Sequence, residues 1–157
     1  MRKTFEAFLE SLVVWLTGFL ALVVIAGFLF RKFGAPLVWY DELAPILLAW
    51  LTYYGSCLAA LRRAHIGFPK LVAAAPPPLR EALGWVREIC VVSFFAIAAW
   101  AGWKVLGVLG GVTLVSLEWM PARLTQSVIP VSAAVFIAAE LIAFAESRRE
   151  HAEEVRS

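Results

Sequence analysis

The sequence is short of charge and of histidine. Only 17% of its 157 residues are Asp, Glu, Lys or Arg, whereas 62% are hydrophobic, and soluble domains carry about a quarter charged residues. The net charge of +2 gives no support for a nucleic-acid partner. One of the two histidines, His151, lies in the C-terminal tail, which excludes haem ligation by paired histidines between helices. The deficit of charge predicts an integral membrane protein.

Cysteine and catalytic groupings are equally scarce. Cys57 and Cys90 lie inside apolar stretches and lack the spacing of a metal or redox motif, so we interpret them as small hydrophobic residues. The sequence shows no nucleophile paired with a base, no metal triad and no phosphate-binding loop. We therefore expect neither an enzyme nor a cofactor in this chain.

Four apolar stretches are long enough to cross a bilayer, which takes about 20 residues. We expect one all-α membrane domain over residues 1–157, with transmembrane helices at approximately residues 8–30, 41–62, 85–109 and 122–145. The prolines at positions 76–78 should exclude helix there, and residues 112–120 should form a short interfacial turn. Pro130 should kink the fourth helix.

The basic residues predict the orientation. Ten of the 14 Lys and Arg side chains lie near the termini or in the second connection, on one side of the expected membrane. The other four are Arg31, Lys32, Lys104 and Arg123. Because cytoplasmic segments are enriched in Lys and Arg, we expect both termini in the cytoplasm. The expected location is the inner membrane of a bacterial or archaeal cell.

Two ionisable residues within the spans need a reason, since a charge at the centre of a membrane helix costs about 2.5–3.5 kcal/mol. At about 1.5 Å per residue, Lys104 lies near the outer interface, at the depth of Asp41 and Glu42. Glu140 lies near the inner interface, at the depth of Arg62, Arg63 and Arg87. We expect each residue to snorkel or pair at its own interface, without forming an ion-conducting relay.

Residues around the second helix resemble a known family. Trp39-Tyr40-Asp41-Glu42-Leu43 is followed by Trp50 and Tyr54-Gly55, and the helix leaves through Arg62-Arg63-Ala64-His65-Ile66. With four spans and Ile129-Pro130 in the last helix, this pattern is similar to the small, DctQ-like membrane subunit of tripartite ATP-independent periplasmic (TRAP) transporters. Asp41 stands where that family often has Glu, and Gly67-Phe68-Pro69 replaces its usual valine and polar continuation.

The resemblance implies a subunit rather than a complete transporter. Its partners would be a large multi-span membrane subunit, which holds the substrate and sodium sites, and a periplasmic substrate-binding protein. The binding protein would deliver an organic anion such as a C4-dicarboxylate or sialic acid, and the sodium gradient would drive uptake. The small subunit would scaffold the large one, help to dock the binding protein and carry no cofactor.

The candidate sites are residues for partner contact or membrane anchoring. At the outer interface, Asp41 and Glu42 could form a cluster with Trp39, through Lys104 or by contact with the partner subunits. Helix capping together with belt anchoring explains them equally well. Trp50 and Gly55 fit helix packing better than ligand binding. At the inner interface, the basic residues fit lipid head groups, the large subunit, or plain anchoring. The full set is Trp39, Asp41, Glu42, Trp50, Gly55, Arg62, Arg63, His65, Lys104, Pro130 and Glu140.

Two other functions stay open. A self-sufficient four-span exporter acting as a homodimer would need an acid within its first helix, whereas Glu10 lies only at that helix's start. A membrane-anchor subunit of a respiratory oxidoreductase would need paired histidines for haem. Co-purification of a much larger membrane partner distinguishes the TRAP subunit from the homodimer, and an absorption spectrum tests for haem.

Overall fold

The computed structural model describes residues 2–62 and 76–154, and the regular elements in these ranges are helices. In chain order they are α1 (Arg2–Lys32), α2 (Tyr40–Leu61), α4 (Pro77–Val108), α5 (Ala122–Gln126) and α6 (Val128–Glu154). Four segments are long and apolar enough to cross a membrane: α1, α2, α4 from Pro78, and α5 with α6 as far as Ala145. The expected all-α fold with four spans is confirmed, and the sidedness of the termini stays a prediction.

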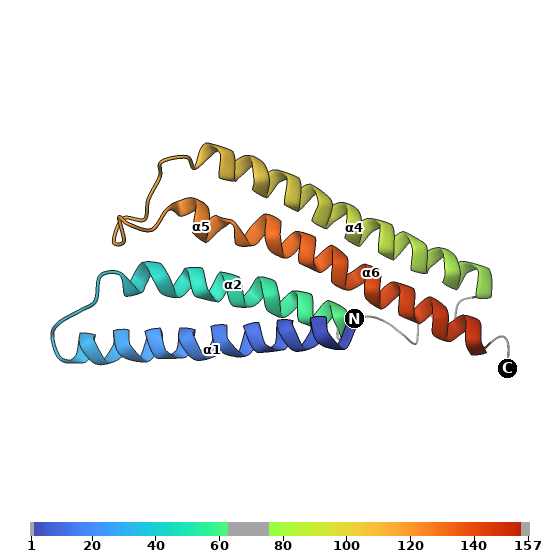
Figure 1. Ribbon diagram of the computed structural model, residues 1–157, viewed down its shortest axis with the longest axis horizontal. Helices are drawn as coiled ribbons and strands as arrows, with labels where there is room; N and C mark the ends of the chain where they lie inside the picture. Colours follow the sequence, from blue (N-terminus) through green and yellow to red (C-terminus); the bar gives the residue numbers. More distant parts are fainter. Residues whose placement is uncertain (1, 63–75, 155–157) are drawn as a thin grey trace.

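The helices form a flat row rather than a square bundle (Figure 1). Helix α2 packs against α1 on one side and α6 on the other, and α6 packs in turn against α4. Helices α1 and α4 are therefore the two edges of the row. One end, which we call the terminal end, holds the start of α1 and the end of α6; the opposite end, the loop end, holds residues 33–39 and 109–121 (Figure 1).

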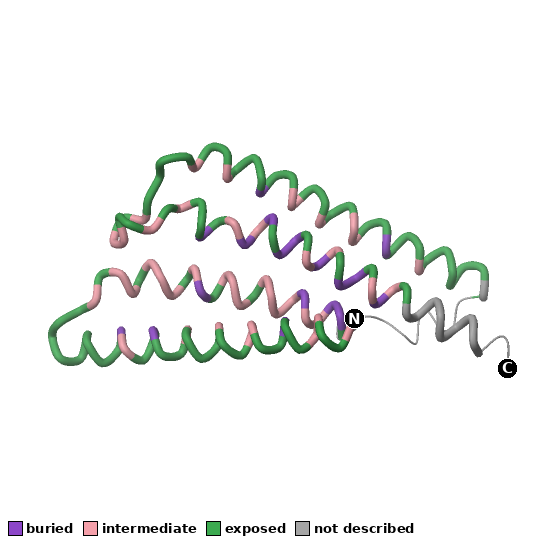
Figure 2. Tube along the Cα trace, in the orientation of Figure 1, coloured by how far each residue is buried: buried purple, intermediate pink, exposed green. Residues whose placement is uncertain are grey.

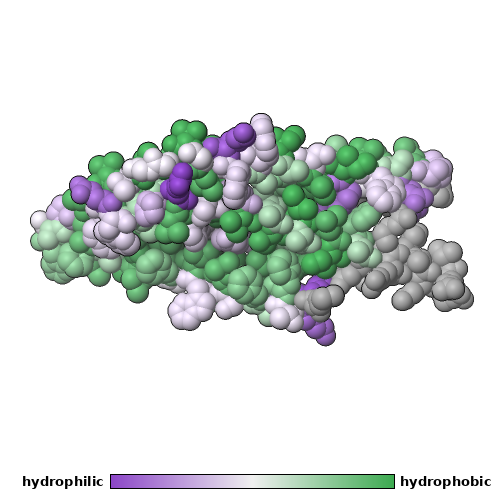
Figure 3. Space-filling model, turned by 45° about the horizontal axis from the view of Figure 1, so that its top comes forward, coloured by the Kyte–Doolittle hydropathy of each residue, from purple (hydrophilic) through white to green (hydrophobic). Residues whose placement is uncertain are grey.

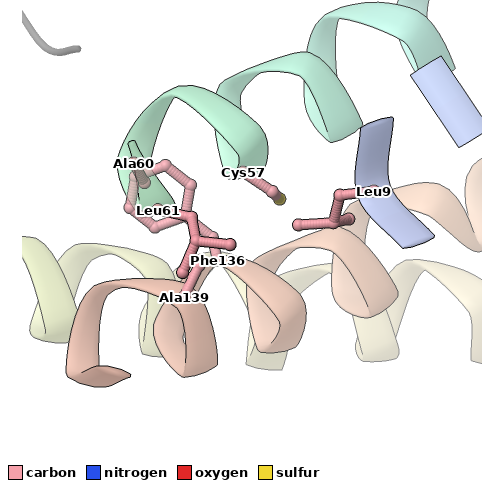
Figure 4. Close-up of a cluster of buried hydrophobic side chains, with 6 residues drawn as sticks. All are labelled: Leu9, Cys57, Ala60, Leu61, Phe136 and Ala139. Carbon is pink, nitrogen blue, oxygen red and sulfur yellow. The ribbon is translucent and has the colours of Figure 1, made fainter. Parts of the chain in front are cut away.

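The core runs along α6. In the most apolar window of the fourth span 44% of residues are buried, against 6% in α4, and Figure 2 shows the buried positions concentrated along α6. The main cluster joins α1, α2 and α6 in the terminal half of the row (Figure 4). Small residues in this cluster let the helix backbones approach closely, as membrane helices require. Its members are Leu9, Cys57, Ala60, Leu61, Phe136 and Ala139.

The turn from α1 to α2 depends on glycine. Helix α1 ends where Gly34 adopts a φ of +77°, a left-handed conformation that side chains disfavour. The N–H of Ala35 then donates to the carbonyl of Phe30 at 3.0 Å, which is the closing bond of a Schellman motif. Gly27 lets the returning chain pack tightly, because a Cβ there would stand 2.4 Å from the ring of Tyr40.

Helix α4 begins earlier than the sequence suggested. Pro76 is its N-cap, and the next two prolines occupy its first turn, so the prediction that they exclude helix was wrong. The first N–H groups of a helix have no acceptor within the helix, and proline's fixed φ suits this position. The same residue type that stops a helix internally therefore starts one here.

The fourth span is interrupted before Pro130. Helix α5 ends at Gln126, Ser127 is its C-cap, and α6 begins at Val128. Proline has no N–H to donate to the carbonyl four residues earlier, here that of Gln126. We expected a kink at Pro130; the structure instead breaks the helix at Ser127 and places the proline in the first turn of α6.

Candidate functional site

Glu42 joins the two connections at the loop end. It lies in the first turn of α2, and its two carboxylate oxygens accept the backbone N–H groups of Val115 at 2.9 Å and Ser116 at 2.8 Å. The hydroxyl of Ser116 also donates to the carbonyl of Val38 at 3.5 Å. A carboxylate that accepts two N–H bonds is a strong anchor. Glu42 thereby fixes the tip of the connection between α4 and α5 against the start of α2.

The loop that Glu42 holds is closed on itself. The N–H of Leu114 donates to the carbonyl of Met120 at 3.1 Å, and that of Ala122 donates to Val112 at 2.9 Å. This arrangement leaves apolar side chains on the outside, with Val115 88% and Trp119 77% exposed. Residues 112–120 thus form an ordered apolar loop tip, and Glu42 of α2 holds it in place.

The other residues expected at this interface do not join Glu42. Trp39 is the N-cap of α2, and its carbonyl accepts the N–H of Leu43 at 3.0 Å. Asp41 points outward, 3.9 Å from Arg31, and both side chains are 68% exposed. Lys104 lies over the ring of Trp100, 5.7 Å from its centroid. Among the described residues neither acid pairs with Lys104, because α4 is the far edge of the row.

Trp50 reaches across to the interrupted helix. Its indole N–H donates to the carbonyl of Thr125 at 3.0 Å. In an unbroken helix that carbonyl would accept the N–H of Ile129. Because α5 ends at Gln126, the carbonyl accepts the indole N–H of Trp50 instead. Pro130 in turn packs on Gly102 of α4, where a Cβ would stand 2.9 Å from its ring. The helix break is therefore contacted from both sides, by Trp50 of α2 at Thr125 and by Gly102 of α4 at Pro130.

The side chain of Arg62 pairs with acidic residues of α1 at the terminal end. Its guanidinium donates to Glu6 at 2.7 Å and to Glu10 at 3.0 Å. Those bonds raise the pKa of Arg62 above its already high usual value. Arg2 completes the junction by donating to the carbonyl of Leu61 at 3.1 Å, the last residue of α2. Charged side chains thus join α1 to α2 at the terminal end, and Arg62 has its partners within this chain.

Glu140 has its charge partner at its own depth, as expected. It is buried on α6, and Arg87 of α4 donates to its carboxylate. Arg87 also lies 3.5 Å from Glu88, a second buried acid. The rings of Trp85 and Phe144 meet edge to face nearby, with centroids 5.2 Å apart. An ion pair and an aromatic pair therefore hold α4 to α6 towards the terminal end.

The chain matches a family model over residues 20–150. The model describes the DctQ component of tripartite ATP-independent periplasmic transporters. The chain belongs to the DctQ family.

A curated relative agrees with the DctQ family assignment. The chain is 28% identical over 98 residues to the C4-dicarboxylate TRAP transporter small permease protein DctQ of Vibrio cholerae serotype O1. The match covers 60% of this chain and 42% of the relative, so this chain spans about two fifths of the relative's length. The assigned family is one of transporter components rather than of enzymes.

The residues of the DctQ-like motif divide into those with partners in this chain and one that faces open space. Trp50 and Arg62 make contacts with other helices, and Glu42 binds the backbone of the loop at residues 115 and 116. A Cβ on Gly55 would meet nothing within 4 Å, so this glycine is not explained by packing inside the chain. Arg63 and His65 lie outside the described residues.

Sequence reasoning missed the partners of the motif residues. Thr125, Val115 and Ser116 contribute backbone groups, which no residue pattern marks as special. Glu6 and Glu10 carried a usable signal, since acids four residues apart on one helix face can share a basic partner. Among the described residues no group of three His, Cys, Asp or Glu side chains is placed to hold a metal ion.

Proposed function

We propose that this chain is the scaffold subunit of a sodium-driven TRAP transporter that imports an organic anion. Its partners would be the large multi-span membrane subunit and a periplasmic substrate-binding protein. The large subunit would hold the sodium and substrate sites, and the chain would lie in the inner membrane with both termini in the cytoplasm. An organic carboxylate such as a C4-dicarboxylate or sialic acid is the proposed substrate class.

The flat row of helices is the observation that carries this proposal. Its interior offers little to a solute: the buried hydroxyls of Thr125 and Ser132 donate to carbonyls three residues back on their own helices. The buried acids Glu88 and Glu140 lie beside Arg87. Meanwhile the face seen in Figure 3 carries extended apolar areas, and large apolar side chains are exposed on α1, α2 and α4. Such surfaces must meet lipid or another protein, which fits a scaffold better than a pore.

Gly55 supports contact with a partner helix. It lies on the outward side of α2 near the exposed residues Leu48 and Thr52, at the spacing of three and four residues that defines one helix face. Small residues on such a face let a neighbouring membrane helix approach closely. We assign this face to the large subunit.

The braced loop tip supports the docking of the binding protein. Residues 112–120 project at the loop end, which the positive-inside rule assigns to the periplasm. Their exposed Trp119 has the character of an interface anchor. Glu42 would act indirectly, by holding this tip in place.

The test is affinity purification of the tagged chain in mild detergent, with mass spectrometry of the proteins that accompany it. We expect a stoichiometric, much larger membrane subunit, and sodium-dependent uptake when the binding protein is added. Gly55→Leu should fold yet lose the large subunit, whereas Gly84→Leu, at another open glycine, should keep it. A chain that purifies alone as a stable homodimer would refute the scaffold and favour the exporter.

The loop end is tested separately. Glu42→Lys should reduce uptake at limiting binding protein, and Asp41→Lys should reduce it less, because Asp41 holds no backbone group of the loop. Trp119→Ala should weaken binding-protein docking without changing complex assembly. Unchanged assembly and uptake with Glu42→Lys would contradict the proposed role of this end.

A further inference from the structure

A pocket opens on α4 near the loop end, beside Gly102 and Lys104. It has a volume of about 320 Å³ and is lined by Trp103, Leu106, Gly107 and Arg123. A Cβ on Gly107 would meet nothing within 4 Å, so the missing side chain leaves the hollow open. Trp103 is 71% exposed at its wall. The pocket is therefore apolar, accessible and bordered by one charged group.

That charged group is the guanidinium of Arg123. Its Nε donates to the carbonyl of Leu106 at 2.9 Å, and one Nη donates to that of Gly107 at 3.4 Å. Both carbonyls belong to the last turn of α4, where helical acceptors lack donors. These contacts orient the guanidinium and use two of its five N–H groups.

The positive charge of Arg123 lacks a full counterpart. Within residues 2–62 and 76–154 it takes part in none of the ion pairs. The carboxyl end of α4 supplies only about half a negative charge. An exposed guanidinium at the end of a membrane span, with free N–H groups and a preset orientation, is suited to an anion.

We propose that this pocket binds the phosphate of an anionic phospholipid, whose acyl chain lies along Trp103 and Leu106. The guanidinium fork matches two phosphate oxygens. Apolar walls suit a hydrocarbon chain but not a small hydrophilic anion, which would lose hydration there. Trp and Arg side chains are also the residues that occupy the level of lipid head groups. Lys104, one turn before Val108, adds a second positive charge to this part of α4.

The experiment titrates the full chain, with any subunit that co-purifies, against dioleoyl phosphatidylglycerol and phosphatidylcholine. Native mass spectrometry counts the bound lipids. We expect tighter binding of phosphatidylglycerol, weakened about tenfold by Arg123→Gln through loss of one charge-assisted bond pair. Gly107→Leu should fill the hollow and weaken binding to a similar extent. It should also fold, because the position is open and leucine favours helix over glycine.

Two matched variants separate the pocket from general effects. Gly84→Leu places the same side chain at another open glycine of α4, and Arg31→Gln removes an exposed arginine at the same end. Neither should change the affinity for phosphatidylglycerol. Equal binding of the two lipids, or undiminished binding by Gly107→Leu, would overturn the proposal even if Arg123→Gln failed to fold. Inorganic phosphate binding as tightly as the lipid would also overturn it, in favour of a free anion site.

Discussion

Replacing Trp50 with phenylalanine tests whether its indole stabilises the interrupted fourth span. The substitution keeps an aromatic ring on α2 but removes the N–H that donates to Thr125 at 3.0 Å. The carbonyl of Thr125 is partly buried and sits beside the break at Ser127. We expect the free energy of unfolding to fall because this acceptor loses its donor.

The size of the effect follows from the membrane setting. Hydrogen bonds between membrane helices contribute about 0.6 kcal/mol on average and up to about 1.7 kcal/mol. An acceptor left without a partner adds about 1–3 kcal/mol in soluble proteins. We therefore expect a loss of about 1–2 kcal/mol for Trp50→Phe, which is roughly a fivefold to thirtyfold change in the folding equilibrium.

The assay is reversible unfolding by sodium dodecyl sulfate in mixed micelles, followed by far-ultraviolet circular dichroism. Trp15→Phe is the matched control, because Trp15 is 76% exposed on α1. Pro130→Ala supplies the second arm of a double-mutant cycle: it restores the N–H that a continuous helix needs. This N–H can donate to the carbonyl of Gln126 and let the helix continue, so that the N–H of Ile129 reaches the Thr125 carbonyl. In that background Trp50→Phe should cost less than half as much.

The double-mutant cycle can also refute the proposed role of Trp50. If Trp50→Phe costs the same with Pro130 and with Ala at that position, then the indole does not serve the helix break. A difference below about 0.5 kcal/mol lies within the usual error of additivity and would refute the coupling. A cost equal to that of Trp15→Phe would refute the role of the hydrogen bond itself.

Three further predictions concern the other contacts. Glu42→Gln should speed amide hydrogen exchange in residues 112–120, measured by mass spectrometry, whereas Asp41→Asn should leave it unchanged; equal rates in both variants would contradict the brace. Arg87→Gln should lower stability by about 2 kcal/mol, less than for a fully buried pair because Arg87 is 58% exposed. Adding Glu140→Gln should recover part of that loss, and purely additive costs would disprove the pairing. Gly102→Leu should cost about 1–3 kcal/mol by forcing α4 from α6, whereas the same change at Gly55 should leave unfolding unaffected.

The spans and one charge pair were predictable from sequence. Residues 11–30 contain no charge, and only a membrane or a large core accommodates such a helix. Depth placed Glu140 level with Arg62, Arg63 and Arg87, and the structure pairs it with Arg87. These features depend on distance along the helix axis, which a sequence records directly.

The lateral arrangement was not predictable in the same way. Glu42 binds backbone groups 73 and 74 residues away, and Trp50 binds one 75 residues away. Which helices are neighbours decides these contacts, and uniformly apolar helices carry little signal about their neighbours. The prolines at positions 76–78 were expected to exclude helix, but the effect of a proline depends on whether it lies in the first turn of a helix or beyond.

The flat row has a consequence for how the chain gains stability. In lipid the hydrophobic effect does not drive helices together, so packing and polar contacts must hold them. Three of those contacts in the described part of the chain are Arg62 with the acids of α1, Trp50 with the end of α5, and Arg87 with Glu140. Each joins two neighbouring helices, and none folds the edges of the row onto each other. A row held in this way leaves large apolar side chains of α1, α2 and α4 exposed, as the proposed scaffold role requires.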